Sequence, residues 1–153
     1  MKGLKLKSAV FSNKRRELEI TYSSGKTLTI HFGALGIVRN LKEVWVDTET
    51  KGRSLGIEYM DGDIDYLPYD QPLHITKDPE YLLQNHIENI IAQIREELEN
   101  RKISKKYLAR QLETSDNQIQ RLLNPGILNK NLTQLYKLAH VLGLQFELFL
   151  KAA

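Results

Sequence analysis

Six polar side chains lie within one short stretch, residues 115–121: Ser115, Asp116, Asn117, Gln118, Gln120 and Arg121. The carboxamides of Asn and Gln can make two hydrogen bonds to adenine, and the guanidinium of Arg can make two to guanine. These residue types favour contact with the base edges of a nucleic acid. Polar residues on a short helix can also simply face water, so the elements that carry them must decide between the two interpretations.

Basic residues precede this stretch. Residues 101–121 contain six Lys and Arg residues against only Glu113 and Asp116, an excess larger than the net charge of +3 of the whole chain. Lys and Arg that contact backbone phosphates hold a protein on DNA, in a way that depends on salt and carries little sequence information. We predict phosphate contacts from the side chains at the start of the preceding helix: Arg101, Lys102, Lys105 and Lys106.

The spacing of apolar residues predicts two short helices joined by a tight turn. One apolar face of each helix is formed by Leu108, Ala109 and Leu112, and by Ile119, Leu122 and Leu123. Ser104 and Ser115 stand where each helix needs an N-cap. This is the helix-turn-helix pattern, in which the second helix lies in the major groove. We therefore predict that the helix of residues 115–124 contacts the bases.

Two further helices are expected around this pair. Asp78-Pro79-Glu80 is a strong start signal for an amphipathic helix that runs to about Asn100, and Tyr81 and Leu82 in its first turns could dock on the N-terminal domain or on a second subunit. Residues 132–143 form the last helix, with Gly143 as its C-terminal cap. Residues 144–150 alternate and favour a strand, although an extension of helical structure also fits.

Residues 103–124, Pro125 and the helix of residues 132–143 resemble the XRE-type (lambda repressor/Cro-like) helix-turn-helix domain. Leu-Ala at 108–109, Thr-Ser at 114–115 and Ile-x-Arg-Leu-Leu-Asn at 119–124 carry the resemblance. The tail, residues 142–148, is similar to antitoxin-type regulators, in which a short strand often pairs across a dimer. The resemblance implies a DNA-binding transcriptional regulator, a repressor or an antitoxin-type autoregulator, that binds double-stranded DNA as a homodimer.

Two residues depart from the pattern of this family. Glu113 stands where glycine is common, and a left-handed backbone there costs a non-glycine residue about 1 kcal/mol. Asp116 begins the recognition helix, where neutral or basic residues are more frequent. An acid at this position either weakens the affinity for nearby phosphates or contacts the amino group of a cytosine.

The N-terminal half predicts strands arranged as a tandem repeat. Alternating residues on both sides of Gly25 indicate one β-hairpin, and the same pattern returns around Gly62. Placing Leu4 on Leu41 gives an offset of 37 that runs without a gap through the whole unit. Such a register predicts a duplicated three-strand unit, and two copies facing each other would close a small sandwich or partly open barrel.

The expected fold is α+β with two domains. Residues 1–75 form an all-β domain from two three-strand repeats, residues 4–37 and 41–74, and residues 78–153 form an all-α, lambda-repressor-like helix-turn-helix domain. The expected core of the β-domain contains Phe32, Val44, Trp45, Val46 and the paired tyrosines Tyr22 and Tyr59.

Composition excludes several other classes. The chain has 153 residues, of which 41% are hydrophobic and 27% charged, as in ordinary globular proteins. Cysteine is absent, and the four histidines lack metal-ligand spacing. We therefore predict no enzyme activity, no cofactor and no metal site. No signal peptide or membrane span is recognised, and a cytoplasmic location is expected.

A second hypothesis remains open. The β-domain could bind a toxin or another protein partner, while the helical half mainly dimerises. Asp116 and the modest net charge support this alternative. Binding measured across salt concentrations separates the two hypotheses, because DNA binding must weaken steeply with salt.

Overall fold

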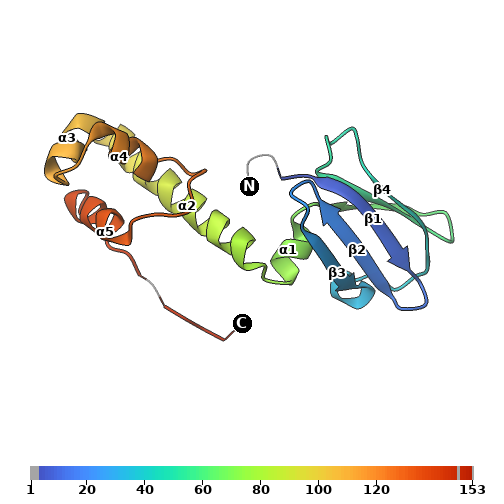
Figure 1. Cartoon of the computed structure of the whole chain (residues 1–153). Coiled ribbons are helices and arrows are strands. Elements are labelled where there is room, and N and C mark those ends of the chain that lie inside the picture. The colour runs from blue at the N-terminus through green and yellow to red at the C-terminus, as the bar shows by residue number, and fades with distance from the viewer. Residues whose placement is uncertain (1–3, 148, 153) are drawn as a thin grey trace. The chain divides into compact units, whose positions relative to one another are not determined.

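The computed structural model describes residues 4–147 and 149–152 (Figure 1). The chain divides into two compact units, one that ends at Tyr81 and one that begins at Leu82. We call them the β unit and the helical unit.

The β unit contains two antiparallel three-stranded sheets, each with its strands in sequence order. The first sheet consists of β1 (Leu6–Ser12), β2 (Glu17–Tyr22) and β3 (Thr27–His31). The second consists of β4 (Leu41–Val46), β5 (Ser54–Tyr59) and β6 (Ile64–Pro68). The predicted tandem three-strand repeat and the α+β class are therefore confirmed.

The register confirms one half of the predicted repeat alignment and corrects the other. In the hairpins, Leu18 pairs with Ile30 and Leu55 with Leu67, which preserves the offset of 37. In the leading strands, Phe11 pairs with Leu18 and Val46 with Leu55, so β1 and β4 correspond at an offset of 35. Eight residues separate Val46 from Leu55, whereas six separate Phe11 from Leu18, so the second repeat has two additional residues between these pairs. Because side chains alternate with period two, a shift of two residues leaves the hydrophobic pattern unchanged.

Each repeat accepts a hydrogen bond from a backbone N–H at the start of the other repeat's leading strand. The Leu6 N–H donates to the carbonyl of Gly52, and the Leu41 N–H donates to the Asn13 side-chain oxygen, both at 2.8 Å. The two sheets share a single apolar core, which includes the fully buried side chains of Tyr22, Phe32, Leu18, Ile20, Leu41 and Leu55. The two copies therefore support each other.

Trp45 was expected in this core and instead lies on the outer face of the second sheet. It pairs with Gly56 across β4 and β5, and a Cβ at Gly56 would lie only 2.1 Å from the Trp45 ring. Tyr66 meets the same indole edge-on, with 6.2 Å between ring centroids. Its neighbours Val44 and Val46 do pack against the core, as predicted. Successive side chains of a strand point to opposite faces, so Trp45 could not share the core face with both valines.

Short helical segments follow the third strand of each repeat. After β3 comes the 3-10 helix η1 (Phe32–Leu35). After β6 comes α1 (Gln71–Ile75), where the sequence predicted strand structure to about residue 73. Five residues are too few for a periodic signal, and Pro72 occupies a first-turn position that helices tolerate.

The long helix α2 (Pro79–Asn100) begins as predicted. The Asp78 carboxylate accepts a hydrogen bond from the Tyr81 N–H at 3.0 Å and pairs with the Lys26 ammonium at 2.8 Å. Burial opposes ionisation of Asp78, but the bond and charge of Lys26, together with hydrogen bonds from the backbone of Tyr81 and Glu80, outweigh it and hold the pKa of the carboxyl below its usual value. Tyr81 is buried in the core of the β unit, in agreement with the expected docking of this turn on the N-terminal domain, whereas Leu82 is exposed.

The helical unit continues with α3 (Lys105–Gln111), α4 (Asp116–Leu122) and α5 (Leu132–Val141). A second core, separate from that of the β unit, joins the four helices. Residues 144–147 and 149–152 form no strand, so the strand expected at 144–150 is not found in the described part of the tail, and Leu148 lies outside it. An alternating segment needs a neighbouring strand to form a ladder, and none of the described strands pairs with it. No helix in the described ranges is long and apolar enough to span a bilayer.

Candidate nucleic-acid interface

The turn between α3 and α4 has the backbone that the sequence predicted. Ser104 Oγ accepts from the Tyr107 N–H at 3.1 Å, and Ser115 Oγ accepts from the Gln118 N–H at 3.2 Å, so both serines cap their helices. Glu113 has φ of +53°, the left-handed conformation expected at this position. The Thr114 N–H returns to the Ala109 carbonyl at 2.9 Å and closes the turn.

Packing of α3 against α4 decides which side of α4 faces solvent. Leu108 and Ile119 are completely buried, and Ala109 is small enough to bring the helices together. Asn117 and Arg121 lie four residues apart on the opposite side of α4, and therefore on one exposed face. The short helix thus presents polar side chains outward along its length.

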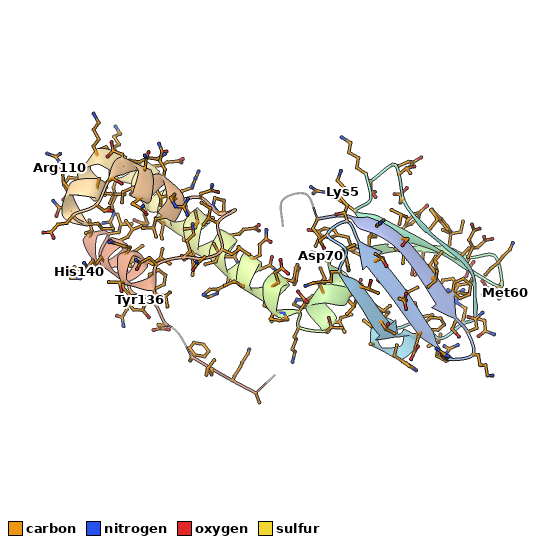
Figure 2. The ribbon with its side chains drawn as sticks, in the orientation of Figure 1. Lys5, Met60, Asp70, Arg110, Tyr136 and His140 are labelled. Atoms are coloured by element: carbon orange, nitrogen blue, oxygen red, sulfur yellow. The ribbon has the colours of Figure 1, made fainter. Side chains whose placement is uncertain are left out.

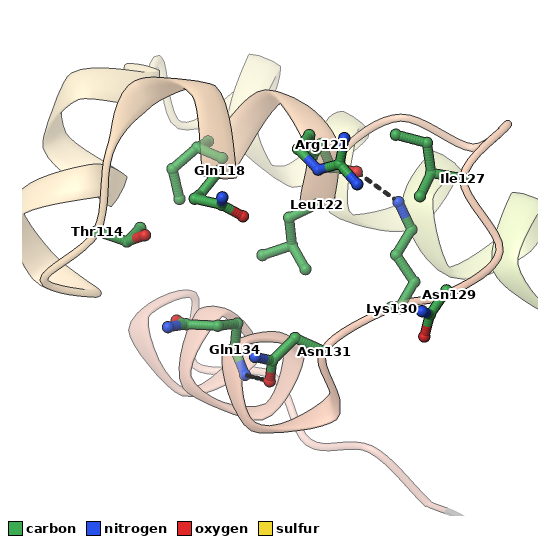
Figure 3. Close-up of a pocket in the computed structure, with 10 residues that line it drawn as sticks. Thr114, Gln118, Arg121, Leu122, Ile127, Asn129, Lys130, Asn131 and Gln134 are labelled. Atoms are coloured by element: carbon green, nitrogen blue, oxygen red, sulfur yellow. Dashed lines mark hydrogen bonds between the residues drawn. The ribbon is translucent and has the colours of Figure 1, made fainter.

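All predicted base-contacting residues are exposed: Ser115, Asp116, Asn117, Gln118, Gln120 and Arg121. Gln118 and Arg121 line a cavity of about 310 Å³ between α4, the loop that follows it and the start of α5 (Figure 3). Ser115 and Asp116 line a different depression, beside Lys106 and Arg110 of α3. Four of the six residues therefore line one of two hollows on this surface.

The predicted phosphate contacts do not form a single cluster. Lys106 lies beside the start of α4, whereas Lys102 and Lys105 line another depression together with Arg95. These three lysines are exposed and have no ion-pair partner within residues 4–147 and 149–152. Arg101 differs, because its guanidinium pairs with Glu97 one turn earlier in the chain at 3.0 Å.

Two basic residues of this surface were absent from the predicted site. Arg110 is exposed on α3 (Figure 2) and lines the same depression as Lys106. Lys106 precedes Arg110 by four residues, so both lie on one face of α3. That spacing was a usable signal. Lys130 lies in the cavity beside Arg121, and nothing in its polar loop distinguishes it in the sequence. Burial, followed by the charges of Arg121 and Arg95, lowers the pKa of Lys130 to about 8.

The net positive charge of the chain falls on the helical unit. Residues 1–81 carry 12 Lys and Arg and 12 Asp and Glu, whereas residues 82–153 carry 10 and 7, so the whole net charge of +3 falls on the second unit. The described residues contain no group of three or more His, Cys, Asp or Glu that could hold a metal ion. The electrostatics of the helical unit suit a polyanion.

Two capped helices at a tight turn, a lead helix and a closing helix together define a helix-turn-helix domain. Residues 93–151 match the family model of the Cro/C1-type HTH DNA-binding domain. The match begins within α2, covers α3 to α5 and extends into the tail, and it confirms the resemblance to the XRE-type helix-turn-helix domain. Searches of the curated proteins and of the solved structures gave no match.

Proposed function

We propose that this protein is a sequence-specific regulator of transcription that binds double-stranded DNA with α4 in the major groove. The observation that carries the proposal is the exposed polar face of α4, flanked by unpaired cations, within residues that match a DNA-binding domain family. If the polar face of α4 were only exposed to solvent, the excess of basic residues over residues 101–121 would have no role.

Base contacts come from the exposed side of α4. Arg121 donates two hydrogen bonds to a guanine, and the carboxamide of Asn117, on the same face, pairs with an adenine. Gln118 and Gln120 contact the bases to either side, and Asp116 accepts from a cytosine amino group.

Phosphates on either side of the groove meet the basic side chains around α4. Lys102, Lys105 and Lys106 bind them without preference for sequence. Arg101 can join them only by giving up its pair with Glu97, so it contributes least. Arg110 extends the same basic edge.

The regulator acts as a homodimer that occupies two half-sites about 34 Å apart. Occupancy of such a site blocks transcription, which makes the protein a repressor or an antitoxin-type autoregulator within the cell. Sedimentation of the chain with and without its DNA tests the dimer, and a monomer under both conditions would exclude it.

Selection of bound duplexes from a random DNA pool tests the proposal and identifies the operator. We expect an enriched motif with two-fold symmetry, and mobility-shift titrations that show Arg121→Ala losing roughly 1–3 kcal/mol of specific binding. An unchanged affinity in this variant would remove α4 from the groove.

A protein-interaction role for the β unit is the second candidate. The outer face of its second sheet exposes Tyr66 and Ile64 beside Trp45, while the corresponding strand of the first repeat carries Thr27 and Thr29. An aromatic surface of this kind is frequent where proteins meet. Binding of a partner protein that persists at high salt would support this function.

A further inference from the structure

The C-terminal end of α4 is surrounded by cations. A helix leaves its last carbonyls without partners, and its dipole makes this end negative. Three acceptors at this end of α4, the carbonyls of Arg121, Leu123 and Asn124, receive hydrogen bonds from two basic side chains.

The first cation comes from α2. The Arg95 guanidinium donates to the Leu123 carbonyl through Nε at 3.2 Å and Nη2 at 2.9 Å. Leu123 is the C-cap residue of α4 and is itself buried. Arg95 therefore ties the end of the recognition helix to the lead helix of its own domain.

The second cation comes from the loop between α4 and α5. The Lys130 ammonium donates to the carbonyl of Arg121 at 2.7 Å (Figure 3) and to the carbonyl of Asn124 at 2.6 Å. No carboxylate of the described residues pairs with it, and the charged groups that act on it, Arg121 from α4 and Arg95 from α2, are both positive. Only the helix end compensates this half-buried charge.

We propose that Arg95 and Lys130 form a clamp on the C-terminal end of α4 that positions the recognition helix for base contacts. The inference rests on the DNA-binding function proposed above. Seven residues are too few for a helix to be stable without support, so its orientation depends on what holds its ends. Ser115 caps the N-terminal end of α4, and the clamp holds its C-terminal end, at and just after Arg121.

A rival role for Lys130 is direct contact with a phosphate. An ammonium has three N–H donors, and two are used on carbonyls. The two roles differ in their dependence on salt. Loss of a phosphate contact weakens binding to all sequences and reduces the salt slope by about 0.9, whereas loss of a positioning residue weakens specific binding and leaves the slope unchanged.

The test compares Lys130→Met with Lys130→Arg in the full chain. The probes are the duplex that the chain selects from a random pool and a duplex of the same length with shuffled sequence. We expect Lys130→Met to lose about ten-fold in affinity for the selected duplex and less than about two-fold for the shuffled one, at an unchanged salt slope. Lys130→Arg, for which the adjoining cavity leaves room, should retain most of the affinity.

The pH dependence of the specific affinity provides a second test. A role that did not depend on the charge of Lys130 would leave this dependence unchanged. Lys130 loses its charge as the pH rises through its pKa of about 8, so specific affinity of the natural chain should fall between pH 7 and pH 9. Lys130→Arg stays charged throughout this range and should show a flat profile. Equal losses on both duplexes with a reduced slope, or no loss in Lys130→Met, would overturn the clamp.

Amide hydrogen exchange tests the clamp without DNA. The N–H groups of Leu123 and Asn124 bond to carbonyls of α4, and Lys130→Met should speed their exchange while the amides of α3 stay protected. If the natural chain selects no duplex, the proposed function fails, and this exchange still decides whether Lys130 holds the end of α4. Unchanged exchange at these amides would refute the clamp itself.

Discussion

The two units carry nearly equal numbers of basic residues but use them differently. In the β unit three cations bond to acids from distant parts of its sequence: Lys26 to Asp78, Arg39 to Asp61 and Asp63, and Lys42 to Glu58. The described part of the helical unit shows a single ion pair, between Arg101 and Glu97. The cations around α3 and α4 stay available to an outside anion.

This difference shows that the distribution of charge says more than its total. A net charge of +3 is weak evidence for a nucleic-acid partner. Divided between the units, it becomes a neutral β unit, in which three cations pair with acids, and a basic helical unit, whose described residues show one ion pair. The first pattern supports a fold, and the second suits binding to DNA.

The strongest test of the division is a pair of core substitutions. Leu108→Ala removes a fully buried side chain of the helical core and should lower the free energy of unfolding of that unit by about 2–5 kcal/mol. Leu18→Ala should do the same to the β unit. Amide exchange followed residue by residue reports both, because the two cores share no residue. Equal loss of protection in both units from either substitution would show that the division is wrong.

Matched arginine substitutions compare the two uses of charge. Arg121→Ala should lose roughly 1–3 kcal/mol of specific DNA binding, as stated above. Arg39→Ala removes surface pairs with Asp61 and Asp63 and should leave DNA affinity unchanged, with only a small loss of stability because solvent screens exposed ion pairs. Mobility-shift and chemical-denaturation titrations measure the two effects. If Arg39→Ala weakened DNA binding as much as Arg121→Ala, the claim that the two units use their cations differently would be wrong.

Glu113 offers a substitution that should strengthen the helical unit. Its φ of +53° costs a non-glycine residue about 1 kcal/mol, which Glu113→Gly would largely recover. Denaturation of this variant should show the gain, and DNA affinity should change little because the side chain is not among the predicted contacts. A loss of stability would mean that the Glu113 side chain makes a compensating contribution.

The smallest expected effect concerns single lysines. Lys106→Ala should weaken binding to every duplex a few-fold and reduce the salt slope by about 0.9. Lys42→Ala, whose lysine pairs with Glu58 at 3.4 Å in the β unit, is the matched control and should leave the slope unchanged. Indistinguishable slopes for the two variants would remove Lys106 from the interface.

The sequence predicted the parts of the fold that depend on local chemistry. The serine caps of α3 and α4, the left-handed Glu113 and the start of α2 after Asp78 follow from single residues and their spacing, and the structure has them all. The hairpins of the repeat were equally accessible, because each has a glycine with positive φ at its tip.

The remaining features depend on contacts between distant residues. An offset of 35 in the leading strands gives the same alternation as an offset of 37, so no pattern could separate them. The roles of Arg95 and Lys130 depend on carbonyls 28 and up to nine residues away, which composition and periodicity do not show. The predicted base and phosphate contacts remain predictions, since exposure alone does not establish a contact.

Salt dependence of the affinity for the selected duplex tests the central claim most directly. The account predicts that the logarithm of the binding constant falls linearly with the logarithm of salt concentration, by about 0.9 for each phosphate contact, and that Arg121→Ala lowers the line without changing its slope. An affinity that is indifferent to salt, or a chain that selects no duplex at all, would contradict it.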